Sequence, residues 1–292
     1  MRLRGQMPLE MELKFERFYT SLIVRLGDIE EHRDRFDLAV GPWTRAWERC
    51  VVASTAHPEH VGLFDDLCWA ENRLYDAYLH LSNWEMTEFH RAGLERSVAR
   101  LLEQSPERPL TLWVSLNAHA LEAKLAVGFG DFEGAMVHRV KSARIGMELC
   151  RMVPQNREYA YTLVRNCYAS AGVIAMARAK RRMRGQSTSD LPMPESFMEV
   201  ARLQMDELGR TESAHADFWA LLDYKEHNAA IIAIAQDDVD AYADHRRAGL
   251  RLAEQRLVLF PLSVQAAERV LELRESVAGV CLRGSDVGKS AY

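Results

Sequence analysis

The chain has 292 residues and a mass of 33.3 kDa, with 48% hydrophobic residues, 27% charged residues and a formal net charge of −5. The mild negative charge argues against a protein that binds nucleic acid over its whole surface, because that footprint is usually basic. No run of 18 apolar residues predicts a membrane helix, and the first ten residues lack the apolar core of a signal peptide. We therefore expect a soluble, cytoplasmic protein, long enough to bury a continuous core in one large or two ordinary domains.

The N-terminal region predicts a short disordered segment, residues 1–9, followed by helices over 10–56 that pack on the rest of the chain. Residues 10–26 form the clearest amphipathic helix, with apolar residues at helical spacing: Phe15, Phe18, Tyr19, Leu22, Ile23 and Leu26. Gly27-Asp28 is expected to end this helix and start another over 29–39. Gly41-Pro42 is expected to break the chain again before a helix over 43–53.

The remainder predicts long helices in antiparallel pairs, and no segment shows the alternation of a strand. The expected helices are 61–81, 84–102, 110–127, 133–152, 157–184, 194–208, 212–235, 237–259 and a capping helix within 261–282. Residues 185–194 are expected to be a flexible loop and residues 283–292 a loose tail. The prediction is an all-α protein of about eleven helices.

One helical hairpin recurs along the chain. Trp113 and Leu116 precede Gly130-Asp131 and Ala135, and the later copy is Trp219, Leu222, Gln236-Asp237 and Ala241. Both copies fit Trp-x2-Leu-x13-[Gly/Gln]-Asp-x3-Ala. A hairpin cannot bury its apolar faces alone, so a repeated hairpin predicts stacked neighbours and a solenoid.

This pattern resembles the tetratricopeptide-repeat family, whose motif has Trp and Leu on the first helix, Gly-Asp-aromatic at the turn and Ala on the second helix. Gly130-Asp131-Phe132 matches that turn, whereas the second copy has Gln236 in place of Gly and Asp238 in place of the aromatic residue. The resemblance implies a right-handed α-solenoid over residues 57–260, with helices longer than those of the standard repeat of about 34 residues.

The resemblance also implies a concave groove, lined by first helices, that captures a protein or peptide. An Asn side chain can both donate to and accept from a peptide unit. The candidate contact residues are Asn72, Arg73, Asn117, His119, Arg165, Asn166, Lys225 and Asn228. The alternative is that they are ordinary solvated residues of helices.

Four His-Arg pairs recur, and three of them follow a turn residue by seven positions. They are His32-Arg33, His90-Arg91, His138-Arg139 and His245-Arg246. Repeated positions on returning helices predict a repeated structural contact, such as an inter-helix hydrogen bond. A pH-sensitive surface and a metal site are the alternatives.

Two acidic clusters suggest an enzyme as the alternative. Asp65, Asp66 and Glu71 are similar to the aspartate-rich Mg²⁺ motif of class I terpenoid synthases, with residues 236–240 as a second cluster. The spacing of the first cluster departs from that motif, and helix capping explains the second. Glu212-Ser-Ala-His215 supplies only one half of a di-iron site.

Basic and cysteine residues fit structural roles. The basic run Lys180–Arg184 ends a predicted helix, where cations complement the dipole, although it could also contact an acidic partner. The five cysteines have no metal or redox spacing and are expected to be buried free thiols: Cys50, Cys68, Cys150, Cys167 and Cys281.

The sequence thus favours a bacterial, non-enzymatic scaffold or regulatory protein without a cofactor, which binds a protein or peptide partner. A metal-dependent all-α enzyme and a ligand-sensing regulatory subunit stay open as alternatives, and so does a homodimer. Neither membrane nor nucleic acid is expected as a partner.

Overall fold

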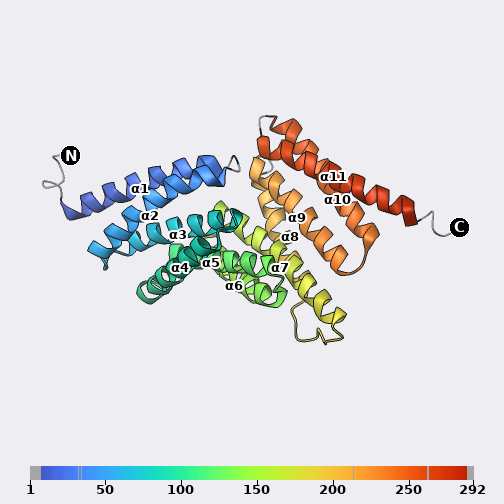
Figure 1. Cartoon of the computed structure of the whole chain (residues 1–292), viewed down its shortest axis with the longest axis horizontal. Coiled ribbons are helices and arrows are strands. Elements are labelled where there is room, and N and C mark those ends of the chain that lie inside the picture. The colour runs from blue at the N-terminus through green and yellow to red at the C-terminus, as the bar shows by residue number, and fades with distance from the viewer. Residues whose placement is uncertain (1–7, 32, 34, 213, 262, 288–292) are drawn as a thin grey trace. The chain divides into compact units, whose positions relative to one another are not determined.

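The computed structural model describes residues 8–31, 33, 35–212, 214–261 and 263–287, and within these ranges it is all-α (Figure 1). It contains eleven helices there and no strand, which confirms the predicted class. The helices are α1 (Leu9–Glu31), α2 (Phe36–Ala56), α3 (Val61–His80), α4 (Trp84–Gln104), α5 (Pro109–Gly128), α6 (Phe132–Met152), α7 (Arg157–Met183), α8 (Pro194–Glu212), α9 (Ala216–Ala235), α10 (Val239–Leu259) and α11 (Val264–Val287).

The chain divides into two compact units, and each is stabilised by contacts between helices. Residues 1–121 form the first unit, in which α1 packs on α2, α2 on α3 and α3 on α4. Residues 122–292 form the second unit, in which α6 packs on α7, α9 on α10 and α10 on α11. Packing between successive helices is compatible with a helical-repeat fold.

The two breaks expected near the N-terminus are absent, because both residues that suggested them lie inside helices. Gly27 is buried within α1, and a Cβ added there would lie 2.3–2.7 Å from three atoms of the Trp43 indole ring. This glycine therefore permits close helix packing. Pro42 lies inside α2, which continues through it to Ala56.

The expected loose tail over residues 283–292 is also corrected. Helix α11 extends to Val287, so residues 283–287 of the expected loose tail are helical. Residues 1–7 and 288–292, which complete the expected disordered N-terminus and tail, lie outside the described residues, as does His32.

Three hairpin turns are built in the same way. One residue in each turn has a left-handed φ: Ser82 (55°), Gly130 (70°) and Asp237 (62°). The next residue donates its backbone N–H to a carbonyl five positions earlier, which satisfies the end of the preceding helix. Its side chain then accepts from the N–H three residues later, and these capping residues are Asn83, Asp131 and Asp238. The shared geometry supports an internal repeat of the α3–α4, α5–α6 and α9–α10 hairpins.

This geometry corrects the register of the sequence motif by one residue. Asp238, and not Asp237, is the structural counterpart of Asp131, because both accept the capping hydrogen bond. Asp237 instead corresponds to Gly130, since both have a positive φ. The spacing from Trp to the turn therefore differs by one residue between the two copies.

Helix α7 is the centre of the second unit. Both α8 and α9 pack extensively on α7, whereas they make few contacts with each other. At its C-terminal end, Lys180 donates to the carbonyl of Gly130 at 2.5 Å and Arg182 donates to the carbonyl of Ala235 at 2.7 Å. Two residues of the basic run thus bind carbonyls in the turn after α5 and at the end of α9, whereas the expected interaction was with the dipole of their own helix.

The loop after α7 is held by side chains. Arg178 donates to the carbonyls of Thr188 and Leu191 at 3.0 and 3.1 Å, and Arg181 forms an ion pair with Asp190 at 2.8 Å. Leu191 is buried. The segment expected to be a flexible loop is therefore attached to α7 at several points.

Candidate functional site

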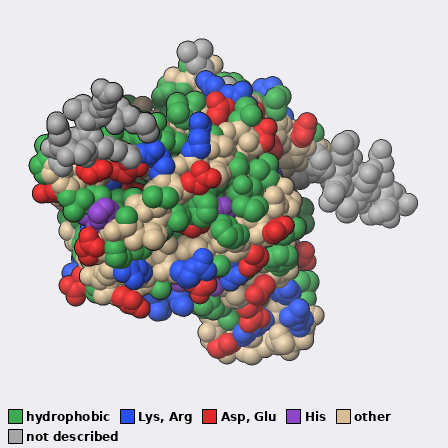
Figure 2. Space-filling model, turned by 60° about the vertical axis from the view of Figure 1, so that its left-hand side comes forward, with side chains coloured by type: hydrophobic (Ala, Val, Ile, Leu, Met, Phe, Trp, Pro, Cys, Tyr) green, Lys and Arg blue, Asp and Glu red, His purple; other side chains and the backbone are tan. Residues whose placement is uncertain are grey.

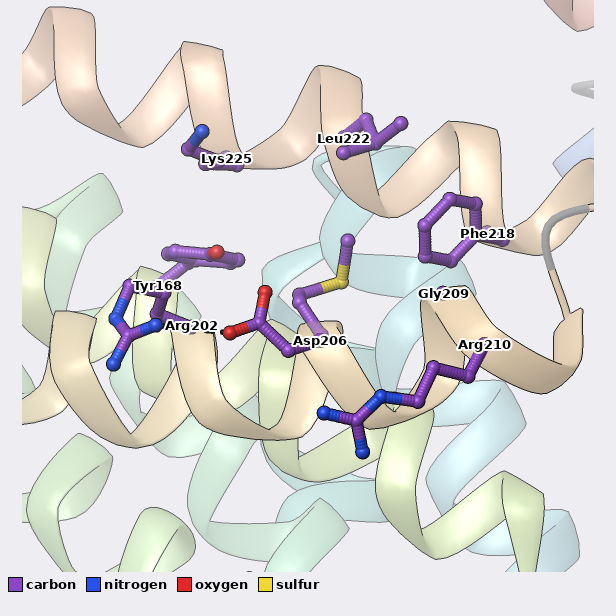
Figure 3. Close-up of a pocket in the computed structure, with 9 residues that line it drawn as sticks. Tyr168, Arg202, Asp206, Gly209, Arg210, Phe218, Leu222 and Lys225 are labelled. Carbon is purple, nitrogen blue, oxygen red and sulfur yellow. Dashed lines mark hydrogen bonds and ion pairs between the residues drawn. The ribbon is translucent and has the colours of Figure 1, made fainter.

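A surface pocket of about 490 Å³ opens between α8 and α9, with α7 as its floor (Figure 3). We call it the α7–α9 pocket. It exists because α8 and α9 both pack on α7 and leave a gap between themselves. One end of the pocket has the apolar side chains of Met205, Phe218 and Leu222, next to Gly209 and Arg210. Figure 3 shows Phe218 and Leu222 on α9 opposite Gly209 on α8.

The other end of the pocket is polar. Tyr168 is 2% exposed, and burial raises the pKa of its hydroxyl to about 12, so the phenol stays neutral and can donate a hydrogen bond. Arg202 bonds Glu199 at 2.7 Å and Asp206 at 2.9 Å. Each carboxylate offsets part of the positive charge of Arg202, so this side of the pocket has little excess charge.

Two further arginines lie on α7 and on α6, which packs against α7. Arg165 lies one helical turn before Tyr168 on α7 and is exposed. Arg139 on α6 donates to the amide oxygen of Asn166 at 3.3 Å, and its buried Nε has no hydrogen-bond partner among the described residues. Burial lowers the pKa of Arg139, and no carboxylate contributes to that shift. Of these two guanidiniums, only that of Arg165 is exposed, and Arg139 is buried beside Asn166.

The sequence-based candidates divide into buried and accessible residues. Asn166 and Asn228 are only 5% and 3% exposed. Asn166 accepts from Ser142 at 2.9 Å, and both amides donate to a carbonyl of their own helix. Both amides thus form hydrogen bonds between or within packed helices. Asn228 also lies close to Gly172 on α7, because a Cβ added to Gly172 would be 2.9 Å from the Asn228 amide oxygen.

The remaining candidates lie in different surroundings. Arg73 on α3 forms ion pairs with Asp28 and Glu31 on α1, so it connects two helices. Asn117 donates to the carbonyl of Trp113 in its own helix. The half-buried residues among the candidates are Asn72, Arg73, Asn117, His119 and Lys225. Of the eight candidates, Lys225 alone lines the α7–α9 pocket, and Arg165 alone is exposed.

The two aspartates that suggested a Mg²⁺ site each bind a different arginine. Asp65 bonds Arg108 at 2.5 Å, and Asp66 accepts two hydrogen bonds from Arg17, at 2.7 and 3.2 Å. Burial nevertheless raises the pKa of both carboxyls. Within the described ranges, no three His, Cys, Asp or Glu side chains come together as metal ligands. The geometry therefore gives no support to the diphosphate-binding alternative.

The His-Arg pairs show a repeated contact at two hairpins. His90 on α4 bonds Glu71 on α3 at 2.7 Å, and His245 on α10 bonds Glu226 on α9 at 2.8 Å. Both pairs are separated by 19 residues. The first is buried and is completed by Trp47, whose indole donates to Glu71 at 2.7 Å. The predicted inter-helix hydrogen bond is confirmed for these two pairs.

Cysteine chemistry is disfavoured at the described positions. Cys50, Cys68 and Cys167 are buried free thiols, as predicted, whereas Cys150 is half-buried. Burial raises the pKa of Cys150 to about 11 and that of Cys167 to about 12, so neither forms a reactive thiolate near neutral pH. The side chain of Cys281 lies outside the described residues.

Comparison with known proteins gives no family: no family model matches the sequence, and no curated protein matches it. Among the described residues no helix is both long and apolar enough to cross a bilayer. On the face shown in Figure 2, acidic and basic side chains are interspersed, so that face offers no extended basic area for a phosphate backbone.

Of the residues that line the pocket, only Lys225 was a contact residue predicted from the sequence. Met205, Phe218 and Leu222 occupy ordinary apolar positions of amphipathic helices, and nothing in their spacing distinguishes a pocket from a packed core. The available signal was the Gly209 position, since a glycine inside a helix often marks close approach or missing side-chain volume.

Proposed function

We propose that this chain is a non-enzymatic, tetratricopeptide-like scaffold or regulatory protein that captures a peptide segment of a protein partner. The observation that carries the proposal is the α7–α9 pocket, open at the surface, with an apolar end and a polar end. A peptide-binding site needs an apolar recess for an anchoring side chain and polar groups for the backbone, and this pocket supplies both.

The apolar end favours a Leu-, Met- or Phe-sized anchor. Its walls are Met205, Phe218 and Leu222, and no charged group on α9 separates the last two. Lys225 and the neutral Tyr168 hydroxyl at the other end can donate to peptide carbonyls.

The exposed Arg165 favours a partner peptide that also carries a carboxylate. Arg165 lies on the same face of α7 as Tyr168, and Arg139 has an amide but no carboxylate as its hydrogen-bond partner among the described residues. A partner peptide with an apolar side chain near an Asp, a Glu or its own C-terminal carboxylate would occupy both features. A cytoplasmic location in a bacterium belongs to the same proposal, and the free cysteines among the described residues support a reducing compartment.

A displayed library of random peptides, half of them with a free C-terminus, tests the proposal. The variant Leu222→Glu places a charge in the apolar end and should weaken binding of the selected peptides by about 100-fold. Leu203→Glu is the matched control, because Leu203 is 56% exposed on α8 and does not line the pocket. Selected peptides that bind Leu222→Glu as tightly as the original chain would refute the assignment.

The arginines are tested with the same peptides. Arg165→Glu should weaken binding by at least tenfold. Arg251→Glu, an exposed arginine on α10, should leave it unchanged. Capping the peptide carboxylate as an amide should abolish the difference between Arg165→Glu and the original chain. A difference that persists with the amide would contradict recognition of a carboxylate.

A further inference from the structure

Helix α1 has two apolar faces. The inner face has the smaller side chains. Its residues Leu13, Thr20 and Gly27 are buried, and Val24 packs beside Trp43. The outer face carries seven large apolar side chains, each between 44% and 64% exposed: Met11, Phe15, Phe18, Tyr19, Leu22, Leu26 and Ile29. We call these seven residues the outer stripe of α1. Packing of the inner face on α2 leaves this stripe about half exposed, and the guanidinium of Arg49 on α2 lies over the Tyr19 ring, 4.6 Å from its centroid.

The stripe is larger than an ordinary surface requires. If a large apolar side chain has about 200 Å² and each is about half exposed, the seven residues expose on the order of 700 Å². The largest apolar patch of a typical monomer is about 300–600 Å². One partner of a standard interface buries about 800 Å², so the stripe supplies most of the area that a stable pair needs.

The spacing of the stripe is symmetric about its middle. The midpoint between residues 18 and 19 is equally far from the two members of three apolar pairs. These pairs are Phe18 and Tyr19, Phe15 and Leu22, and Met11 and Leu26. A two-fold axis at that midpoint therefore brings apolar residues of one copy level with apolar residues of another. Self-complementarity of this kind is what an isologous dimer requires.

We propose that α1 pairs antiparallel with α1 of a second copy of this chain, through the outer stripe. Phe18 then lies next to its own counterpart at the axis, and Phe15 is level with Leu22 of the second copy. A parallel pair would bring the exposed Arg25 of both copies together, whereas the antiparallel pair holds them at opposite ends. Helix dipoles are also opposed in the antiparallel arrangement.

A membrane surface fits the stripe less well than a second copy does. Helices that bind anionic membranes carry a lysine- and arginine-rich polar face. Here Lys14 is paired with Glu10 at 2.7 Å, so that end of α1 offers no net positive charge.

Sedimentation velocity of the full chain at micromolar concentrations tests the pairing. We expect a dimer, and Phe18→Glu should weaken it by at least about 100-fold, because a charge would be buried at the axis. Val258→Glu is the matched control, since Val258 is 80% exposed on α10, and it should leave the dimer intact. Melting followed by circular dichroism should show both variants folded, because both side chains are exposed.

Cysteine crosslinking tests the orientation in a Cys281→Ser background. Phe18→Cys should form a disulfide-linked dimer on oxidation. Met11→Cys should not, because the two copies of residue 11 would be about 22 Å apart along the helix axis. An equimolar mixture of Met11→Cys and Leu26→Cys chains should crosslink to each other.

Several outcomes would overturn the proposal. A monomer at all concentrations, a dimer that survives Phe18→Glu, or a dimer lost equally in Val258→Glu would each exclude the stripe as the interface. Self-crosslinking of Met11→Cys would exclude the antiparallel arrangement. A monomer that dimerises only after removal of residues 1–7, or that binds phosphatidylglycerol vesicles through the stripe, would assign the stripe another occupant.

Discussion

The contact between Gly27 and Trp43 provides a sharp test of the packing in the first unit. In Gly27→Ala the new methyl group would lie 2.3 Å from the indole Nε1 and within 2.7 Å of two further ring atoms. The ring cannot move away at low cost, because Trp43 is 0% exposed and its Nε1 donates to the carbonyl of Val24 at 3.2 Å.

The magnitude follows from three contributions. Overpacking costs about 3 kcal/mol at the upper end of its usual range, which is appropriate for an immobilised ring. Loss of the indole hydrogen bond costs about 1 kcal/mol. Replacing a helical glycine by alanine returns about 1 kcal/mol. The net loss is about 3 kcal/mol, or a fall in Tm of roughly 6–12 °C.

Gly41→Ala is the matched control. Gly41 is exposed inside α2, and a Cβ there meets nothing within 4 Å. The same substitution should therefore stabilise the chain by about 1 kcal/mol. Urea unfolding followed by circular dichroism measures both variants. Equal stabilities, or a Gly27→Ala chain more stable than the original, would refute the close approach of α1 to Trp43.

Three further predictions follow from buried polar groups. Glu71→Ala should cost about 3 kcal/mol in urea unfolding, because it leaves His90 buried without its acceptor; a loss below 1 kcal/mol would contradict a buried pair. Asn166→Ala should cost about 1–3 kcal/mol, since Ser142 loses its side-chain acceptor; an unchanged melting temperature would instead indicate a surface amide. Burial and the nearby Arg269 lower the pKa of His227, so the folded state resists its protonation. Stability should therefore fall as pH drops below about 6.5, the value of an unperturbed histidine, and His227→Gln should reduce that fall; identical pH profiles for variant and original would contradict the assignment.

Much of the fold could be predicted from the sequence, because helix periodicity is a local property. The hairpin turns could be located for the same reason, because Gly, Ser, Asn and Asp in these segments favour turns and helix caps. The positive φ of Asp237, and with it the one-residue change of register, is not visible in the sequence. The helix breaks at Gly27 and Pro42 were wrong, because their roles depend on a neighbouring helix or on helix continuity that local propensity does not show.

The candidate site was harder to predict. An Asn on a first helix has the same sequence signature whether it faces a ligand or bonds inside the stack, as Asn166 does with Ser142. The pocket arises from how α8 and α9 are placed on α7, and that placement is long-range. Sequence periodicity identifies which residues are apolar, but not which of them lack a neighbour.

The packing of α9 on α7 also has a kinetic consequence. Most helix contacts join elements adjacent in sequence, which gives low contact order and favours rapid, independent formation of hairpins. Docking of α9 is different, because the chain must first close a loop that contains α8 and residues 184–193. We therefore expect α7 and its partners on the N-terminal side to gain hydrogen-exchange protection first, and the pocket to form only when α9 docks.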